Sequence, residues 1–147
     1  MGAIVTHSPA EVIRQYLLDQ LVGSAPPSTP WPCYVASMPT EGNEAIAVYD
    51  ATGGRVQGRH QRGGKTVETR NITIRVRAED YKTGRSKADS ICTLFDLVLR
   101  AAVTIDAVPY LINAVSRVSS IKHLGPSDAL RQLNLFSVDF LATVSDS

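Results

Sequence analysis

The clearest pattern in the chain is a change in the spacing of apolar side chains between residues 70 and 96. Over residues 71–79 apolar and polar residues alternate, as in a strand with one buried face. Apolar residues then recur at helical spacing over residues 88–98. We therefore predict a strand covered by the helix that follows it, with Arg75 and Arg77 on the strand's solvent-facing side. The expected core positions are Ile72, Ile74, Val76, Ala78, Ala88, Ile91, Phe95 and Val98.

The residues from Ser8 onward predict a first helix. Ser8 is a good N-cap, Pro9 suits the first helical position, and Glu11 completes a capping-box signature. Gly23 is the expected end of this helix, because glycine readily adopts the left-handed conformation that closes a helix.

Two further segments have a composition that is unusual for regular structure. Residues 24–32 hold four prolines, so we expect a stiff connection there, with Trp31 packed on the core. Residues 51–66 combine five glycines and four bases with His60, and Val56 is their one aliphatic side chain larger than alanine. We interpret this segment as an extended basic hairpin loop and as the best local candidate for a binding element.

The remaining strands and the fold class follow from the same patterns. Further strands are expected at residues 33–36, 45–50, 103–105, 110–121 and 130–144. Turn residues at 125–128 should join the last two in an antiparallel hairpin. We predict an α+β fold in one domain over residues 1–147. It should consist of a single antiparallel or mixed sheet of about four to five strands, two helices on one face and the long hairpin loop.

Composition places the chain among ordinary globular proteins. Its 147 residues are 44% hydrophobic, and no run approaches the roughly 18 uninterrupted apolar residues of a membrane span. The first residues lack a secretory signal pattern, so we expect a cytosolic protein with no membrane partner. Cys33 and Cys92 are too few for a disulfide framework, and we expect both to be reduced.

The net charge is only +1, but the charges are unevenly spread. Residues 1–54 contain one base, Arg14, against five acidic residues. Residues 55–77 contain seven bases against a single acid, Glu68. Such asymmetry suits either an anionic ligand or a self-complementary contact between copies of the chain. The seven bases are Arg55, Arg59, Arg62, Lys65, Arg70, Arg75 and Arg77.

The sequence offers no constellation of catalytic or metal-binding residues. The three histidines, His7, His60 and His123, have no second ligand at the spacing of a metal site. Glu79, Asp80 and Asp89 cluster where the strand joins the helix, and we interpret them as charges favoured by the helix dipole. Nucleophile-elbow, Walker and dinucleotide motifs are missing from the sequence. We therefore expect no enzyme, no cofactor and no metal.

Nucleic-acid binding is an alternative that the arginines leave open. The bases of residues 51–66, together with Arg75 and Arg77, could contact phosphates. However, no aromatic residues interleave with these arginines to stack on bases, and the overall charge is near zero.

The order of elements resembles a known family. The segment NEAIAVYDATGG, the glycine- and arginine-rich loop, and NITIRVRAEDYKTGRSKADSI are similar to the tail terminator, or tail completion, proteins of long-tailed bacteriophages. The resemblance covers about residues 43–99. The matching residues are Ala47, Val48, Tyr49, Asp50, Gly53, Ile74, Arg75, Val76, Arg77, Tyr81 and Ala88.

The resemblance implies a structural virion protein that is assembled in the cytoplasm of the host bacterium. Such a subunit forms a ring, typically of six copies, which caps the tail tube and stops its polymerisation. Its expected partners are other copies of itself, the tail tube protein and the head-tail connector or neck proteins, with phage DNA passing nearby in the ring lumen. A head-tail joining or neck protein is the alternative within the virion. The expected interface residues are Arg55, Arg59, His60, Arg62, Lys65, Arg75 and Arg77.

Overall fold

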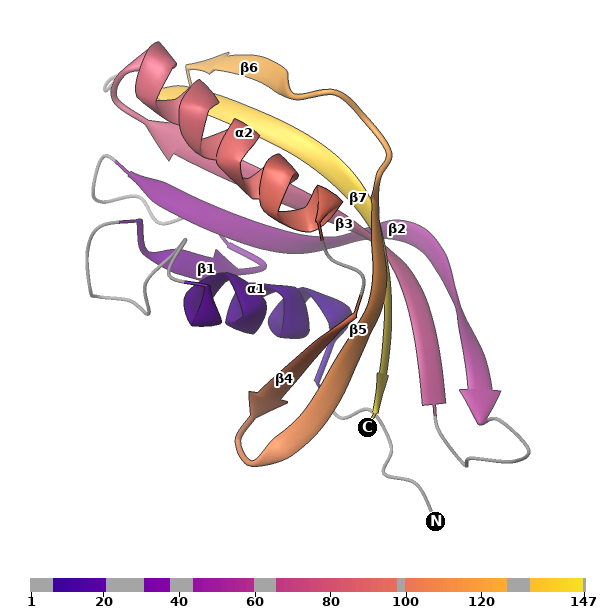
Figure 1. The fold of residues 1–147 in the computed structure, drawn as a ribbon. Helices are drawn as coiled ribbons and strands as arrows, with labels where there is room; N and C mark the ends of the chain where they lie inside the picture. Colours follow the sequence, from indigo (N-terminus) through magenta and orange to yellow (C-terminus); the bar gives the residue numbers. More distant parts are fainter. Residues whose placement is uncertain are drawn as a thin grey trace.

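A computed structural model describes residues 7–20, 31–37, 44–59, 66–97, 100–126 and 133–146. It contains two helices and seven strands over these residues (Figure 1). In chain order these are α1 (Pro9–Asp19), β1 (Cys33–Val35), β2 (Ala45–Arg59), β3 (Thr66–Ala78), α2 (Tyr81–Asp96), β4 (Ala101–Ile105), β5 (Val108–Arg117), β6 (Lys122–Pro126) and β7 (Asn134–Asp146).

All seven strands belong to one mixed sheet. Its order is β1-β2-β3-β7-β5-β4, with β6 also paired to β7. The β1–β2 pair is parallel, and the other pairs are antiparallel. Helix α1 contacts both edge strands, β1 and β4, so the sheet curls around this helix as a half-barrel (Figure 1). The α+β class is confirmed, but the expected four to five strands are too few.

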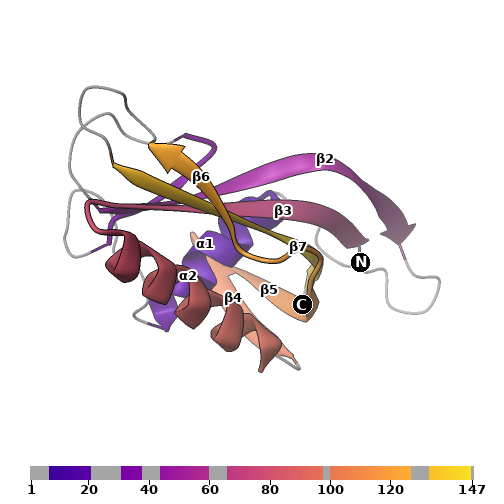
Figure 2. The same cartoon turned by 90° about the horizontal axis from the view of Figure 1, so that it is seen from above.

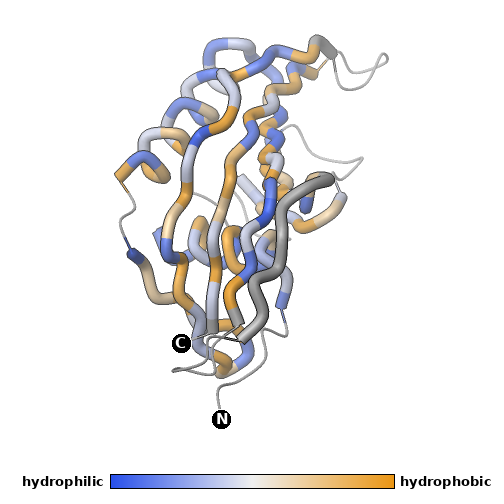
Figure 3. Tube along the Cα trace, turned by 90° about the vertical axis from the view of Figure 1, so that its right-hand side faces the viewer, coloured by the Kyte–Doolittle hydropathy of each residue, from blue (hydrophilic) through white to orange (hydrophobic). Residues whose placement is uncertain are grey.

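Both helices cover the same, concave face of the sheet (Figure 2). The predicted alternation along β3 is confirmed: Ile72, Ile74 and Val76 are buried among the side chains of α1 and α2. The same alternation of apolar and polar residues runs along the neighbouring strands (Figure 3). Burial of this apolar face of the sheet under the helices is the main contribution of the alternating pattern to the stability of the fold.

Helix α1 begins as the sequence predicts. The Glu11 amide donates to Ser8 Oγ over 3.2 Å, and the Ser8 amide donates to Glu11 Oε1 over 3.0 Å, which completes the capping box. The helix ends at Asp19, with Gln20 as its C-cap, so the predicted end at Gly23 is too late. Gly23 itself lies outside the described residues.

The interpretation of residues 51–66 as an extended hairpin loop between two strands is wrong for residues 51–59, which are strand. Strand β2 continues to Arg59, and β3 begins at Thr66. Their outer halves remain paired from Gly54 opposite Arg70 to Arg59 opposite Thr66, with a register shift after Asp50. Bulges of this kind bend a strand while its pairing continues. The segment is therefore a basic β-hairpin that extends the sheet away from the helices (Figure 1).

The C-terminal hairpin is present, but its first arm is interrupted. The expected strand 110–121 ends at Arg117, and β6 follows it along the same edge of β7. β6 was not predicted, because the turn residues expected at 125–128 coincide with its end. The two strands together still pair antiparallel with β7, as expected of the hairpin.

Trp31 and Pro32 are the described residues of the proline-rich connection, whose residues 24–30 lie outside the described chain. The indole of Trp31 is packed against the core, as predicted, and Lys87 Nζ lies 5.2 Å from the ring centroid.

The turn between β4 and β5 is strained at Ala107. Asp106 and Ala107 form a two-residue connection between the paired residues Ile105 and Val108, with φ of 49° and 65°. Such a turn favours glycine at its second position, because a Cβ in the left-handed region costs about 1–2 kcal/mol.

We therefore expect Ala107→Gly to stabilise the protein. The gain should be about 0.5–1 kcal/mol after the extra entropy of the unfolded chain is subtracted. Urea denaturation followed by circular dichroism would measure it, with Ala102→Gly in strand β4 as a control that should destabilise. A lower urea midpoint for Ala107→Gly than for the unmodified chain would show that Ala107 is not strained.

Candidate functional site

The face of the sheet opposite the helices carries two of the seven predicted interface residues, Arg75 and Arg77. We call it the outer face. The pairing register places nine residues of its three central strands on this side: Ala45, Ala47 and Tyr49 of β2, Thr73, Arg75 and Arg77 of β3, and Leu135, Ser137 and Asp139 of β7. Neither α1 nor α2 covers this face (Figure 2).

The two arginines of β3 differ in their environment. Arg75 is half-buried, and its guanidinium carbon lies 5.3 Å from the centroid of the Tyr49 ring, in a cation–π contact. Arg77 is only 4% exposed, so the prediction that it lies on a solvent-facing side is wrong. Its cross-strand partner Ala45 and the next residue on that side of β2, Ala47, are both 0% exposed. This part of the outer face is therefore covered and not open to solvent.

The remaining predicted interface residues belong to the β2–β3 hairpin. Arg55 pairs with Thr69, and Arg59 with Thr66, so both lie on the outer half of β2. His60, Arg62 and Lys65 lie outside the described residues. The structure therefore places two of the five predicted interface residues of the hairpin, Arg55 and Arg59, on one strand.

A polar cluster on the outer face was missed by sequence reasoning. Thr73 Oγ1 donates to Asp139 Oδ1 over 2.7 Å, and Lys122 Nζ to Asp139 Oδ2 over 3.3 Å. Burial raises the pKa of the Asp139 carboxyl, but the hydrogen bonds from Thr73 and Lys122 outweigh it and leave this pKa below its usual value. Asp139 is therefore a carboxylate at neutral pH. The alternation of polar residues along 133–144 is the one signal that could have found it.

The acidic residues at the strand–helix joint line a shallow recess. Glu44, Glu79 and Asp80 surround a cavity of about 470 Å³ together with Ala78 and Thr83. Asp80 occupies the N-cap position of α2, and its Oδ2 accepts a hydrogen bond from Thr83 Oγ1 over 3.2 Å. This position agrees with charges that are favoured by a helix N-terminus.

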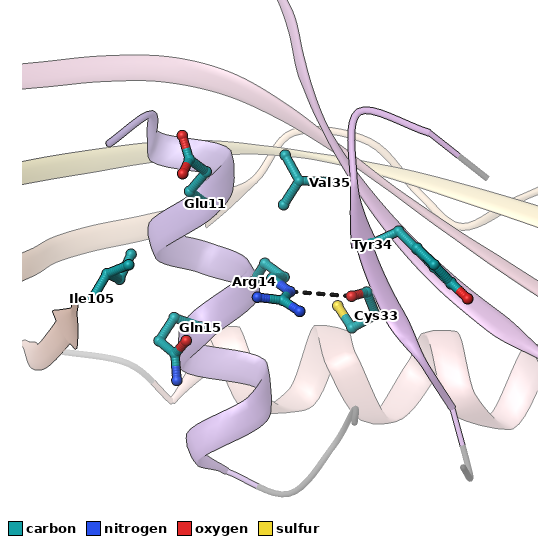
Figure 4. A pocket seen from close by; sticks show the side chains of 7 residues that line it. All are labelled: Glu11, Arg14, Gln15, Cys33, Tyr34, Val35 and Ile105. Atoms are coloured by element: carbon teal, nitrogen blue, oxygen red, sulfur yellow. Dashed lines mark hydrogen bonds between the residues drawn. The ribbon is translucent and has the colours of Figure 1, made fainter. Parts of the chain in front are cut away.

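A second recess lies between α1 and the edge strand β1 (Figure 4). Glu11, Arg14 and Gln15 of the helix face β1 and Ile105 across a cavity of about 400 Å³. Arg14 Nε donates to the carbonyl oxygen of Cys33 over 3.1 Å. Burial raises the pKa of the Cys33 thiol to about 12, so this cysteine is protonated and unreactive at neutral pH.

The described histidines make structural contacts. His7 Nδ1 lies 2.5 Å from the hydroxyl oxygen of the buried Tyr110, and His7 Nε2 lies 3.3 Å from Asp106. His123 Nε2 lies 3.0 Å from the amide oxygen of Asn134. The described part of the chain contains no group of three potential metal ligands. None of its helices has the length and apolarity that a membrane span requires.

Three comparisons with known proteins were informative to different degrees. A chain from the virion of a native gene transfer agent particle is similar in structure, with a TM-score of 0.39 and 13% sequence identity, over 77% of this chain and 78% of that chain. No curated protein sequence matches. The family model for the bacteriophage tail terminator protein matches residues 16–99, which is more than half of the chain. The chain therefore belongs to the bacteriophage tail terminator family and is a structural protein of the virion.

Proposed function

We propose that the protein terminates the phage tail. Copies of the chain, each a single domain over residues 1–147, form a closed ring of six on the end of the tail tube. The ring stops the polymerisation of the tube and presents its other surface to the connector proteins of the head. It is placed in the neck of the virion and assembles in the host cytoplasm.

The observation that carries this proposal is the family match over residues 16–99, and the sheet offers two separate regions for contacts. One is the outer face around Arg75 and Asp139. The other is the basic β2–β3 hairpin, which extends beyond the two helices (Figure 1). A subunit that must contact its neighbours and also the tube needs two such surfaces. We assign Arg75 to the contact between subunits or to the inner wall, and the hairpin bases Arg55 and Arg59 to the tube or neck.

Nucleic-acid binding has less support from the same geometry. Arg77 is 4% exposed, so its guanidinium cannot follow a phosphate backbone, and Arg75, over the Tyr49 ring, is the one base of the pair that remains partly exposed. Filter binding to DNA in a salt titration should therefore show weak binding at physiological salt. Tight binding with a steep salt dependence would favour a nucleic-acid-binding module instead.

The capping of growing tubes tests the proposed function directly. Tail tube protein should polymerise into shorter tubes when the purified protein is present, because capped ends no longer grow. Electron microscopy would measure the tube lengths and the density at tube ends, and sedimentation at low and high salt would follow the ring. Unchanged tube lengths and bare ends at a molar excess of the protein would overturn the proposal. Binding to isolated connector but not to tube ends would identify a neck protein instead.

A further inference from the structure

Two segments at the edges of the sheet have a strand partner on one side only: the outer half of β2, and β4. Strand β1 pairs with β2 only over residues 46–48, so among the described residues the outer half of β2 (54–59) has a partner on one side only, β3. Among the strands that the structure describes, β4 likewise pairs only with β5. Both segments present backbone N–H and C=O groups that can pair with another strand.

The two edges are the ends of one row of paired residues. The row runs from Gln57 through Val67, Ser145 and Leu111 to Ala102. Four antiparallel steps separate β2 from β4, so the two strands run in the same direction. A rotation about an axis along the strands therefore brings the β4 edge of one copy beside the β2 edge of the next, as a parallel pair.

The β4 edge is well suited to accept a strand. The two-residue turn makes Ile105 and Val108 a hydrogen-bonded pair. Hydrogen-bonded and non-hydrogen-bonded pairs alternate along an antiparallel ladder, so the N–H and C=O groups of Ala102 and Thr104 point away from β5. Both residues are exposed. Pro109, which lacks an N–H, is opposite Thr104 at a position where no hydrogen bond is required.

We propose that the subunits of the ring join by pairing residues 54–59 of one copy with residues 101–105 of its neighbour, so that the sheet continues from copy to copy. This inference rests on the proposed function, since it specifies how the ring closes. The contact is heterologous, with a different strand from each copy, which is the kind of interface that generates rings. When the same contact repeats around a closed ring, no copy keeps an unpaired β2 or β4 edge.

Charge disfavours one of the two symmetric pairings, that of two β2 edges. The β2 edge contains Arg55 and Arg59, so two β2 edges repel each other. The β4 edge contains no charged residue, and it ends beside Asp106, whose side chain is 85% exposed. Pairing β2 with β4 therefore avoids bringing two basic segments together.

Thr104→Pro tests the edge. Proline removes only the N–H that points away from β5, and proline is tolerated on edge strands. The variant should fold but fail to form rings on tail tubes, whereas the matched control Thr104→Ala, which keeps the N–H, should assemble like the unmodified chain. Sedimentation with tube protein measures assembly, and circular dichroism measures folding. A folded Thr104→Pro protein that forms rings would overturn the proposal.

Amide hydrogen exchange of the unmodified protein gives a second, independent readout. On assembly, exchange in residues 101–105 and 54–59 should slow by on the order of tenfold or more. Rings that form without this protection would overturn the edge pairing and leave the tail-terminating function intact. A protein that never assembles, even with tube protein, would overturn both.

Discussion

Replacing Ile74 with aspartate should leave the protein unfolded. Ile74 is fully buried between the sheet and the helices, where a carboxylate would have no described basic partner among its apolar neighbours. The cost of burying such a charge, or of protonating it, is several kcal/mol, and a domain has only about 5–15 kcal/mol of stability to lose. Circular dichroism and thermal melting would show the loss directly. Ile74→Val, which removes one methylene, is the matched control and should remain folded with a cost of about 0.5–1.5 kcal/mol.

The neighbouring change Arg75→Glu should have the opposite outcome. Arg75 is half-buried on the outer face, and its described contact is with the Tyr49 ring, which is worth about 0.5–1 kcal/mol at such a site. The variant should therefore fold but fail to cap tail tubes, since its charge is reversed at the proposed contact. Equal unfolding of Ile74→Asp and Arg75→Glu would refute this division between a folding face and an assembly face. Arg77 is unsuitable for the comparison because its side chain is buried.

The sequence predicted the elements whose local signals agree with their packing. The capping box of α1, the alternation along β3 and the helical stripe after Asp80 each combine a local preference with one buried face, and each is present in the structure. Val98 lies outside the described residues. The family resemblance also depended on this part of the chain, and the family model matches over it.

The rest could not be predicted because it depends on pairing between distant strands. The glycine-rich half of β2 has little intrinsic strand preference, and it is held as a strand by β3, which β7 supports on the other side. Arg77 is buried beside its cross-strand partner Ala45, which lies more than thirty positions earlier in the sequence. The link from Asp139 to Thr73 and Lys122 joins three strands that are separate in the chain. Periodicity within one segment contains no information on such partners.

Gly84, in the first turns of α2, is a position where one added methyl group should affect the packing of the helix on the sheet strongly. A Cβ built on Gly84 would lie 2.6 Å from Cε2 of Phe136 and 3.1 Å from the Cβ of Ala78. The Phe136 ring is fully buried, and the rings of Tyr81 and His123 lie 5.2 and 5.0 Å from it, so it cannot turn aside freely. Glycine therefore sets how closely α2 approaches the sheet.

Gly84→Ala should destabilise the protein, although alanine favours the helix. The helical preference of alanine over glycine contributes about 1 kcal/mol of stability, whereas overpacking of a filled core costs about 1–3 kcal/mol. Because the clash involves a confined ring and not the end of a flexible chain, we expect the cost to exceed the gain and the urea midpoint to fall. Ser86→Ala, at an exposed position of the same helix, is the control and should be neutral or slightly stabilising. A Gly84→Ala protein more stable than the unmodified chain would mean that α2 can move away from β7 at little cost, and that the close helix–sheet contact does not fix its position.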